Sequence, residues 1–273
     1  MLKQRVITAS IMVSVFVSIL FLSPWYVFSS VVGLVFCVAA WEWAGLSGIG
    51  RPLQRVSYSL ATAGLGLGLY LWLEGAGDLA LRNLLVIACT WWAIAILWIQ
   101  GFPSSAVLWQ TRFARAVMGW FVILPAWLSC VHLINLPHGR WLVALIVFIV
   151  AAADIGAYFS GRAFGKRKLA PSVSPGKSWE GVWGGMLFSA VVGLVFAYAY
   201  SGYWSWVIGL LVLPTAAISV AGDLLESMLK RHTGVKDSSN LLPGHGGVLD
   251  RVDGLVAAVP VFTLLMFVTH WSL

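Results

Sequence analysis

Residues Ala221–Asp253 read AGDLLESMLKRHTGVKDSSNLLPGHGGVLDRVD and hold four Asp, one Glu, two Lys, two Arg and two His. Long apolar segments lie before and after this stretch. The charges therefore border hydrocarbon, where an unpaired ionised group is costly and where ionisable groups commonly mark a functional site. The stretch predicts a membrane-embedded chain whose chemistry is concentrated at one end of its helices.

The composition of the chain is typical of an integral membrane protein. It has 273 residues, of which 60% are hydrophobic and 10% charged, and its mean hydropathy is +0.90. Soluble domains carry about 25% charged residues. The 16 tryptophans suit the membrane–water interface. Loop orientation and anionic headgroups explain the net charge of +7, so we expect no nucleic acid as a partner.

The hydropathy pattern predicts an all-α, polytopic membrane protein with about nine transmembrane helices. A span needs about 20 apolar residues, and the candidates are Ile7–Leu22, Trp25–Leu46, Val56–Leu73, Leu84–Ile99, Ala116–Ile134, Trp141–Phe159, Val182–Tyr200, Trp204–Ala221 and Leu255–His270. Five spans form an N-terminal region, residues 1–140, and four form a C-terminal catalytic region, residues 141–273. We expect two polar loops of the second region, residues 160–181 and 222–253, to form the active site.

The basic residues predict the orientation of the chain. With the N-terminus in the cytoplasm, all 17 lysines and arginines except Arg82 and Arg140 fall in cytoplasmic segments. This bias is the positive-inside pattern, and adding or removing one span would destroy it. We therefore expect the N-terminus and both polar loops in the cytoplasm, where nucleotides are found, and the C-terminus outside.

The first polar loop, residues 160–181, combines basic side chains with glycines that let backbone N–H groups approach an anion. Lys177 and Ser178 resemble the end of a phosphate-binding P-loop, but Pro171 occupies the place of the first glycine, which excludes a Walker motif. Asp154 lies in apolar sequence just before the loop and needs a cation or hydrogen-bond donors. An ordinary basic loop facing anionic lipid is the structural alternative.

The second polar loop begins as a helix that continues from the eighth span. Helical spacing places polar side chains on one face and apolar ones on the other, namely Asp223, Glu226, Ser227 and Lys230 against Leu225, Met228 and Leu229. We expect this helix to end at Gly234. Asp250 and Asp253 open the ninth helix, where the helix dipole stabilises carboxylates.

These two helix ends would bring Asp223 and Asp250 together at the cytoplasmic mouth of the bundle. Carboxylates that act together with substrate phosphates suit Mg²⁺, so we expect both residues as Mg²⁺ ligands and leave a second cation open. The positive charge that a polyphosphate needs would come from Lys230, Arg231, Lys236 and Arg251. A salt-bridge network that ties the two helices together is the alternative.

For Glu42 and His245 the sequence supports two interpretations equally. Glu42 lies in the second span and is either a functional intramembrane group or a side chain that reaches the cytoplasmic rim. His245 lies beside glycines that admit a substrate, but a hydrogen bond that stabilises the turn explains it equally well.

The charged stretch contains the pattern Ser227-x-x-Lys-Arg-x4-Lys236-Asp237-x8-Gly-Gly247-x2-Asp250-Arg251-x-Asp253. This pattern resembles, with no mismatch, the signature of the phosphatidate cytidylyltransferases, also called CDP-diacylglycerol synthases. SPGKSWEG at Ser174–Gly181 and GDLLES before the signature are also similar to that family. The resemblance covers about the second half of the chain, and the first five spans are compatible with it. One departure is Ile155, where the family usually has a hydroxyl residue after the aspartate.

The resemblance implies an enzyme of phospholipid biosynthesis that converts CTP and phosphatidate to CDP-diacylglycerol and diphosphate. The resemblance implies that the enzyme lies among the lipids of a bacterial inner (plasma) membrane. Whether it forms a homodimer stays an open alternative. We expect the metal at Asp223 and Asp250 and catalytic roles for Lys230, Arg231, Lys236, Asp250 and Arg251. The residues expected to bind substrate are Ser174, Gly176, Lys177, Ser178, Ser227 and His245.

Two alternative functions remain at this point. A CTP-dependent lipid kinase, such as a polyprenol kinase, would attack the γ-phosphorus and would need a general base for a lipid hydroxyl. An ion-coupled transporter would use Asp154, Asp223 and Asp250 as an ion pathway, but the charges gather at one mouth rather than near the membrane midplane.

Overall fold

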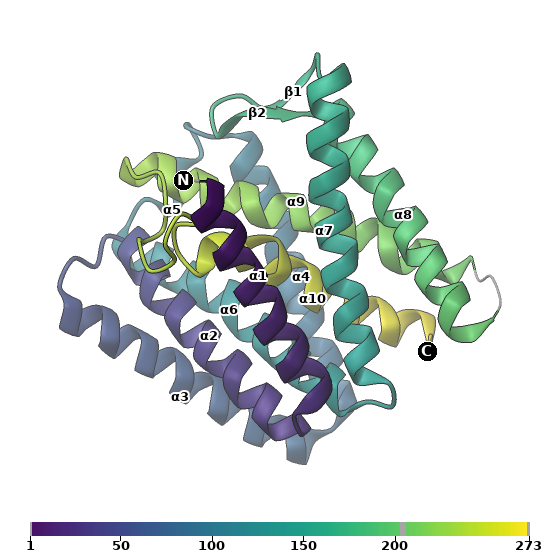
Figure 1. Ribbon diagram of the computed structural model, residues 1–273. Coiled ribbons are helices and arrows are strands. Elements are labelled where there is room, and N and C mark those ends of the chain that lie inside the picture. The colour runs from purple at the N-terminus through teal and green to yellow at the C-terminus, as the bar shows by residue number, and fades with distance from the viewer. Residues whose placement is uncertain (1, 203–205, 272–273) are drawn as a thin grey trace.

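The computed structural model describes residues 2–202 and 206–271, and its framework consists of nine long helices within these ranges (Figure 1). They are α1 (Leu2–Leu22), α2 (Trp25–Leu46), α3 (Pro52–Ala76), α4 (Asp78–Gln100), α6 (Arg112–Asn135), α7 (Gly139–Phe164), α8 (Trp179–Ser201), α9 (Val207–Thr233) and α10 (Leu249–Thr269). A short helix, α5 (Ala106–Trp109), and a hairpin of β1 (Lys168–Ala170) and β2 (Ser174–Ser178) complete the described secondary structure.

The nine expected spans coincide with the nine long helices. Eight of these helices, α2 to α4 and α6 to α10, are long and apolar enough to cross a membrane, and α1 contributes a shorter apolar segment, Val6–Leu22. The start of the eighth expected span, Trp204, lies outside the described residues. The chain is therefore an integral membrane protein of the polytopic, helical class.

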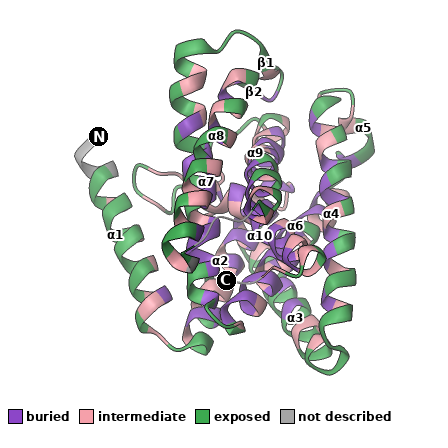
Figure 2. Cartoon of the chain, turned by 90° about the vertical axis from the view of Figure 1, so that its right-hand side faces the viewer, coloured by how far each residue is buried: buried purple, intermediate pink, exposed green. Residues whose placement is uncertain are grey.

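The core of the bundle lies among α2, α6, α7, α9 and α10, whereas α1 and α3 are mostly exposed (Figure 2). Large apolar side chains such as Leu60 on α3 and Leu97 on α4 point outward, 67% and 66% exposed. In a bilayer these side chains contact lipid tails, so their exposure needs no protein partner. The outer helices thus form the lipid-facing surface, and the central helices hold the buried polar groups.

The hairpin is the departure from the expected all-α fold. We expected a loop over residues 160–181, but α7 continues to Phe164, and β1 pairs antiparallel with β2 through Lys168 opposite Ser178. A hairpin outside the membrane satisfies its edge groups with water, which the bilayer would not allow. The short helix α5 was not expected either, because four residues carry too little periodicity to detect.

Helix α9 follows its prediction closely. It continues unbroken past the apolar span and ends at Gly234, whose φ of 72° is the left-handed conformation of a helix C-cap. Leu225, Met228 and Leu229 are buried on one face, as their spacing predicts. Helix α10 packs against α9, and a side-chain carbon on Gly222 would lie 2.1 Å from the Asp253 carbonyl oxygen. Glycine at position 222 therefore sets the close approach of the two helices.

Candidate active site

A cavity of about 490 Å³ opens between α7, β2, the start of α8, and α9. Its polar wall is formed by Asp154, Arg162, Gly176, Lys177, Ser178 and Asp223, and its apolar wall includes Val182 and Val220. It lies at the end of the bundle that carries the hairpin, residues 234–248 and the α2–α3 turn, here called the loop end. Both polar loops singled out in the sequence contribute to this cavity, so they form one site.

An ion pair between Lys177 and Asp223 spans the cavity wall. The Lys177 Nζ lies 2.6 Å from the Asp223 Oδ2, and the two side chains are 27% and 36% exposed. The Ser227 hydroxyl donates a hydrogen bond of 3.1 Å to the other carboxylate oxygen of Asp223. An exposed pair of this kind is weakly held, so both charges are available to a ligand.

Specific hydrogen bonds fix the hairpin that carries Lys177. The Ser178 hydroxyl accepts from the Gly181 N–H at 3.2 Å and so caps the N-terminus of α8. The Glu180 carboxylate accepts from two backbone N–H groups just before β1. The Arg231 Nε donates to the Val173 carbonyl at 3.1 Å. Arg231, expected to contact phosphate, thus ties α9 to the hairpin, and Ser178 both lines the cavity and caps a helix.

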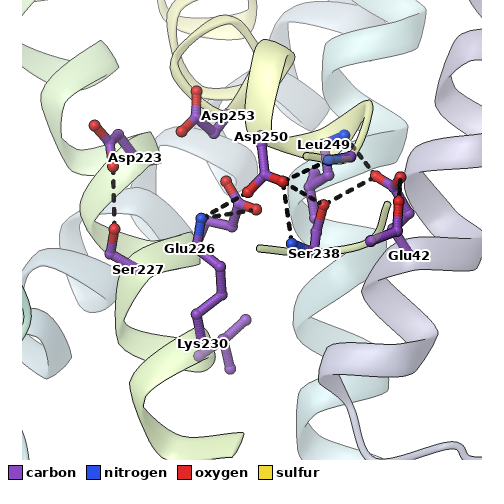
Figure 3. A network of polar contacts seen from close by, with 12 residues as sticks. Glu42, Asp223, Glu226, Ser227, Lys230, Ser238, Leu249, Asp250 and Asp253 are labelled. Carbon is purple, nitrogen blue, oxygen red and sulfur yellow. Dashed lines mark hydrogen bonds and ion pairs between the residues drawn. The ribbon is translucent and has the colours of Figure 1, made fainter. Parts of the chain in front are cut away.

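Asp250 is the centre of a second, more buried cluster beside the cavity (Figure 3). Its Oδ1 accepts from Lys230 Nζ at 2.7 Å. Its Oδ2 accepts from the Gly247 N–H at 2.7 Å and from both the N–H and the hydroxyl of Ser238 at 3.0 Å. Lys230 also lies 3.3 Å from Glu226, which is 2% exposed. The signature residues at 230 and 250 thus join α9, α10 and the chain between them.

Glu42 of α2 belongs to this cluster, so its side chain does not reach solvent at the rim of the bundle. The side chain is fully buried and accepts hydrogen bonds from the Ser238 and Ser239 hydroxyls at 3.2 and 2.5 Å. It also accepts from the N–H groups of Val248 and Leu249 at 2.9 and 2.6 Å. These amides begin α10, where N–H groups lack helical partners and the helix dipole favours an anion. Glu42 therefore caps α10 from another helix.

The carboxylates of α9 and α10 exceed the cations that pair with them. Asp223, Glu226, Asp250 and Asp253 gather along the facing sides of the two helices, with Asp253 between Asp223 and Asp250 (Figure 3). Within the described ranges, only lysines at 177 and 230 form ion pairs with these four. A divalent cation would offset the excess charge, so the donor set fits Mg²⁺. No described group of three His, Cys, Asp or Glu could hold a metal alone, so water and substrate phosphates would complete the coordination.

Some expected site residues lie apart from both clusters. Lys236 is exposed, and Ser174 lies at the start of β2, outside the residues that line the cavity. Arg251 is also exposed, but its charge acts on Asp154 of the cavity wall. The backbone N–H of His245 closes a turn by donating to the Leu242 carbonyl at 2.9 Å. Its ring Nδ1 is buried and has no hydrogen-bond partner among the described residues, so the ring itself does not hold the turn.

Sequence reasoning missed the roles of Ser238 and Ser239 and left Glu42 and Asp154 open. The signal for both acids was a carboxylate within an apolar run, which requires donors or a cation nearby. Asp154 lies on the cavity wall with Asp223. The two serines carry no comparable signal, because a polar loop is the ordinary place for serine.

The fold and the site define a polytopic membrane protein with a cationic and carboxylate-rich cavity at one end, a composition suited to transfer of phosphate-bearing groups. Residues 3–269 match the family model described as the cytidylyltransferase family. The chain belongs to this family and is a nucleotidyltransferase.

Curated relatives are phosphatidate cytidylyltransferases, and two of them match this chain over nearly its full length. A phosphatidate cytidylyltransferase of Pseudomonas aeruginosa is 44% identical over 100% of this chain and 99% of its own length. One of Haemophilus influenzae is 42% identical over 98% of this chain and 99% of its own length. One of Brucella suis is 47% identical over 47% of each chain. These matches confirm the resemblance seen in the signature and extend it to the first five spans, and they do not support the kinase or the transporter.

Proposed function

We propose that this chain transfers the cytidylyl group of CTP to phosphatidate, giving CDP-diacylglycerol and diphosphate. The observation that carries the proposal is the Lys177–Asp223 pair, which is open to a cavity at the loop end of the bundle. The intact signature from Ser227 to Asp253 and the names of the full-length relatives support the same reaction.

The reaction needs no activated side-chain nucleophile. A phosphate oxygen of phosphatidate attacks the α-phosphorus of CTP, a new P–O bond forms, and the bond from the α-phosphorus to the bridging oxygen breaks as diphosphate leaves with its electron pair. Both reactants are anions, so the protein must first bring like charges together. Lys177 stands on the cavity wall, where its ammonium can contact a phosphate oxygen and stabilise the charge that develops on the leaving group.

The carboxylates would hold Mg²⁺ beside these phosphates. The metal would neutralise phosphate charge and polarise the P–O bonds. Asp223 fits this role as it stands, because its carboxylate faces the cavity. Asp250 accepts hydrogen bonds from Lys230, Ser238 and Gly247, so a cation held by Asp250 would lie beside the Lys230 ammonium.

The orientation that we propose places the loop end in the cytoplasm of a bacterial cell, at the inner membrane. The basic excess of the loop-end segments supports this orientation. The Thr8 hydroxyl near the start of α1 donates to the Pro243 carbonyl at 3.4 Å, so the N-terminal helix begins at the same end as the site. CTP would then reach the cavity from the cytoplasm, and phosphatidate from the bilayer past the apolar residues Val182 and Val220.

The decisive experiment follows the two ends of the CTP triphosphate. Protein purified in detergent is incubated with phosphatidate, Mg²⁺ and CTP labelled with ³²P at either the α or the γ position. We expect the α label in the lipid product and the γ label in diphosphate, as resolved by thin-layer chromatography. Absence of α label from the lipid would contradict the proposal, and γ label in the lipid would establish a kinase.

Replacing Asp223 by Asn should change the dependence of the reaction on Mg²⁺. We expect the half-maximal Mg²⁺ concentration to rise about tenfold or more and kcat to fall about 100-fold, because an amide is a weaker ligand for a hard cation than a carboxylate. Steady-state rates at increasing Mg²⁺ test this. Asp78→Asn, at the opposite end of the bundle, is the matched control with unchanged behaviour. An unchanged Mg²⁺ requirement together with a lower rate would remove Asp223 from the metal site.

A further inference from the structure

A second pocket at the loop end has three arginines in its lining. It has a volume of about 440 Å³ and lies between the α2–α3 turn, the start of α6 and the end of α9. Its charged and ionisable lining residues are Arg55, Arg112, Arg115, His232 and Asp237. In the part of the chain that the structure describes, no carboxylate forms an ion pair with any of these three arginines. The pocket shares no lining residue with the Lys177–Asp223 cavity.

Arg115 is the buried member of this group. Arg115 is 8% exposed as a whole residue. Its Nη1 donates a hydrogen bond of 3.0 Å to the Leu46 carbonyl. Its Nε has no hydrogen-bond partner among the described residues. A buried guanidinium with an unmet N–H group and no counter-ion is unfavourable, since both the charge and the donor have lost water. An anion in the pocket would supply the missing counter-ion.

The surrounding residues hold the pocket open and its charges in place. A side-chain carbon on Gly48, where φ is +83°, would lie 3.1 Å from Nη2 of Arg115 and would narrow the space beside it. Arg55 is fixed by a 2.8 Å hydrogen bond from Nε to the Ile49 carbonyl and by its position 5.3 Å from the Trp41 ring centre. Helix α6 begins at Arg112, which adds the positive end of a helix dipole.

We propose that this pocket binds a phosphate group of an anionic ligand at a site separate from the transferase cavity. Arginine forks match the oxygens of phosphate, and several of them together provide charge-assisted hydrogen bonds. Two sources share this chemistry: a phospholipid headgroup, which basic pockets between membrane helices commonly bind, and a soluble diphosphate. Ser238 lines the pocket and also contacts Glu42 and Asp250, so a bound anion would lie next to the buried cluster of the active site.

The test measures ligand-induced thermal stabilisation in detergent, at constant ionic strength and without divalent cations. All proteins carry Lys177→Gln and Arg162→Gln, which remove the two basic side chains that line the transferase cavity. Diphosphate is titrated in one arm and dioctanoyl phosphatidylglycerol in the other, with dioctanoyl phosphatidylcholine as the zwitterionic control. We expect a saturable rise in the unfolding temperature with at least one of the two anions, and the arm that produces it identifies the source.

Two single-arginine variants make the test specific. Arg112 is exposed at the start of its helix, so Arg112→Gln should leave the fold intact and raise the half-saturating concentration about tenfold, the loss of one charge-assisted contact. Arg51→Gln removes an exposed arginine that does not line the pocket and should bind as before. The proposal is overturned if neither anion stabilises the protein, if Arg112→Gln binds normally, or if both variants weaken binding equally.

Discussion

Replacing Lys230 by Met is expected to lower the free energy of unfolding by about 3–5 kcal/mol, the usual cost of removing one partner from a buried ion pair. Lys230 is 14% exposed in its side chain and lies 2.7 Å from Asp250 and 3.3 Å from Glu226. Without the ammonium, two carboxylates would remain close together and poorly solvated. We also expect loss of turnover, because Lys230 holds the carboxylate of Asp250, which we propose as a metal ligand.

A double variant separates the two effects. Lys230→Met combined with Glu226→Gln removes one of the stranded charges, and we expect it to recover part of the lost stability while the enzyme stays inactive. Glu226 suits this test because Lys230 is its one ion-pair partner among the described residues. Reversible unfolding in mixed micelles gives the stability, and transfer of α-labelled CTP gives the activity.

The control for Lys230 is Lys168→Met, which replaces an exposed lysine of β1. It should change the free energy of unfolding by no more than about 0.5 kcal/mol. If Lys230→Met has the same free energy of unfolding as this control, the ion pairs of Lys230 do not stabilise the fold. If the double variant regains activity together with stability, the effect of Lys230 on turnover is purely structural.

The second large effect is expected for Glu42→Ala. The change leaves two N–H groups and the Ser239 hydroxyl without their acceptor, at about 1–3 kcal/mol for each group that stays buried and unpaired, whereas the Ser238 hydroxyl keeps Asp250. The Ser238–Leu249 segment should therefore lose its fixed position, and because Ser238 also bonds Asp250, we expect kcat to fall about 100-fold.

Hydrogen–deuterium exchange tells a local change from general unfolding. In Glu42→Ala the amides of Val248 and Leu249 should exchange faster, whereas amides in the middle of α6 should keep their protection. Glu74→Ala is the matched control: Glu74 is exposed near the end of α3, where it bonds the Tyr70 hydroxyl, and its replacement should change neither exchange nor turnover. Unchanged exchange at 248 and 249 would show that Glu42 does not hold this segment.

The sequence predicted those features that depend on neighbouring residues. Apolar runs located the helices, and helical spacing placed Asp223 and Lys230 on the polar face of α9 and Leu225 on its buried face. Glycine at 234 marked the end of that helix, because the left-handed conformation favours glycine. The signature identified the family because its residues lie within one continuous stretch.

Features that depend on distant contacts could not be predicted in this way. Glu42 and Leu249 are 207 positions apart, and nothing near either residue indicates the other. Arg115 was counted among the cytoplasmic positive charges, whereas the fold buries it beneath the α2–α3 turn. The hairpin was missed because Ser174–Ser178 contains proline and glycine, which strands usually avoid.

The cap that Glu42 places on α10 has a consequence for how the enzyme is made. The ribosome completes α2 early, but the amides that Glu42 binds belong to residues 248 and 249 and are made together with α10. Before α10 is made, the Glu42 carboxylate lacks these amide donors, and the Ser238–Leu249 segment is not held in place by them. The candidate active site therefore cannot assemble before α10 has been made, and a chain that stops short of residue 248 lacks the amide donors that Glu42 binds.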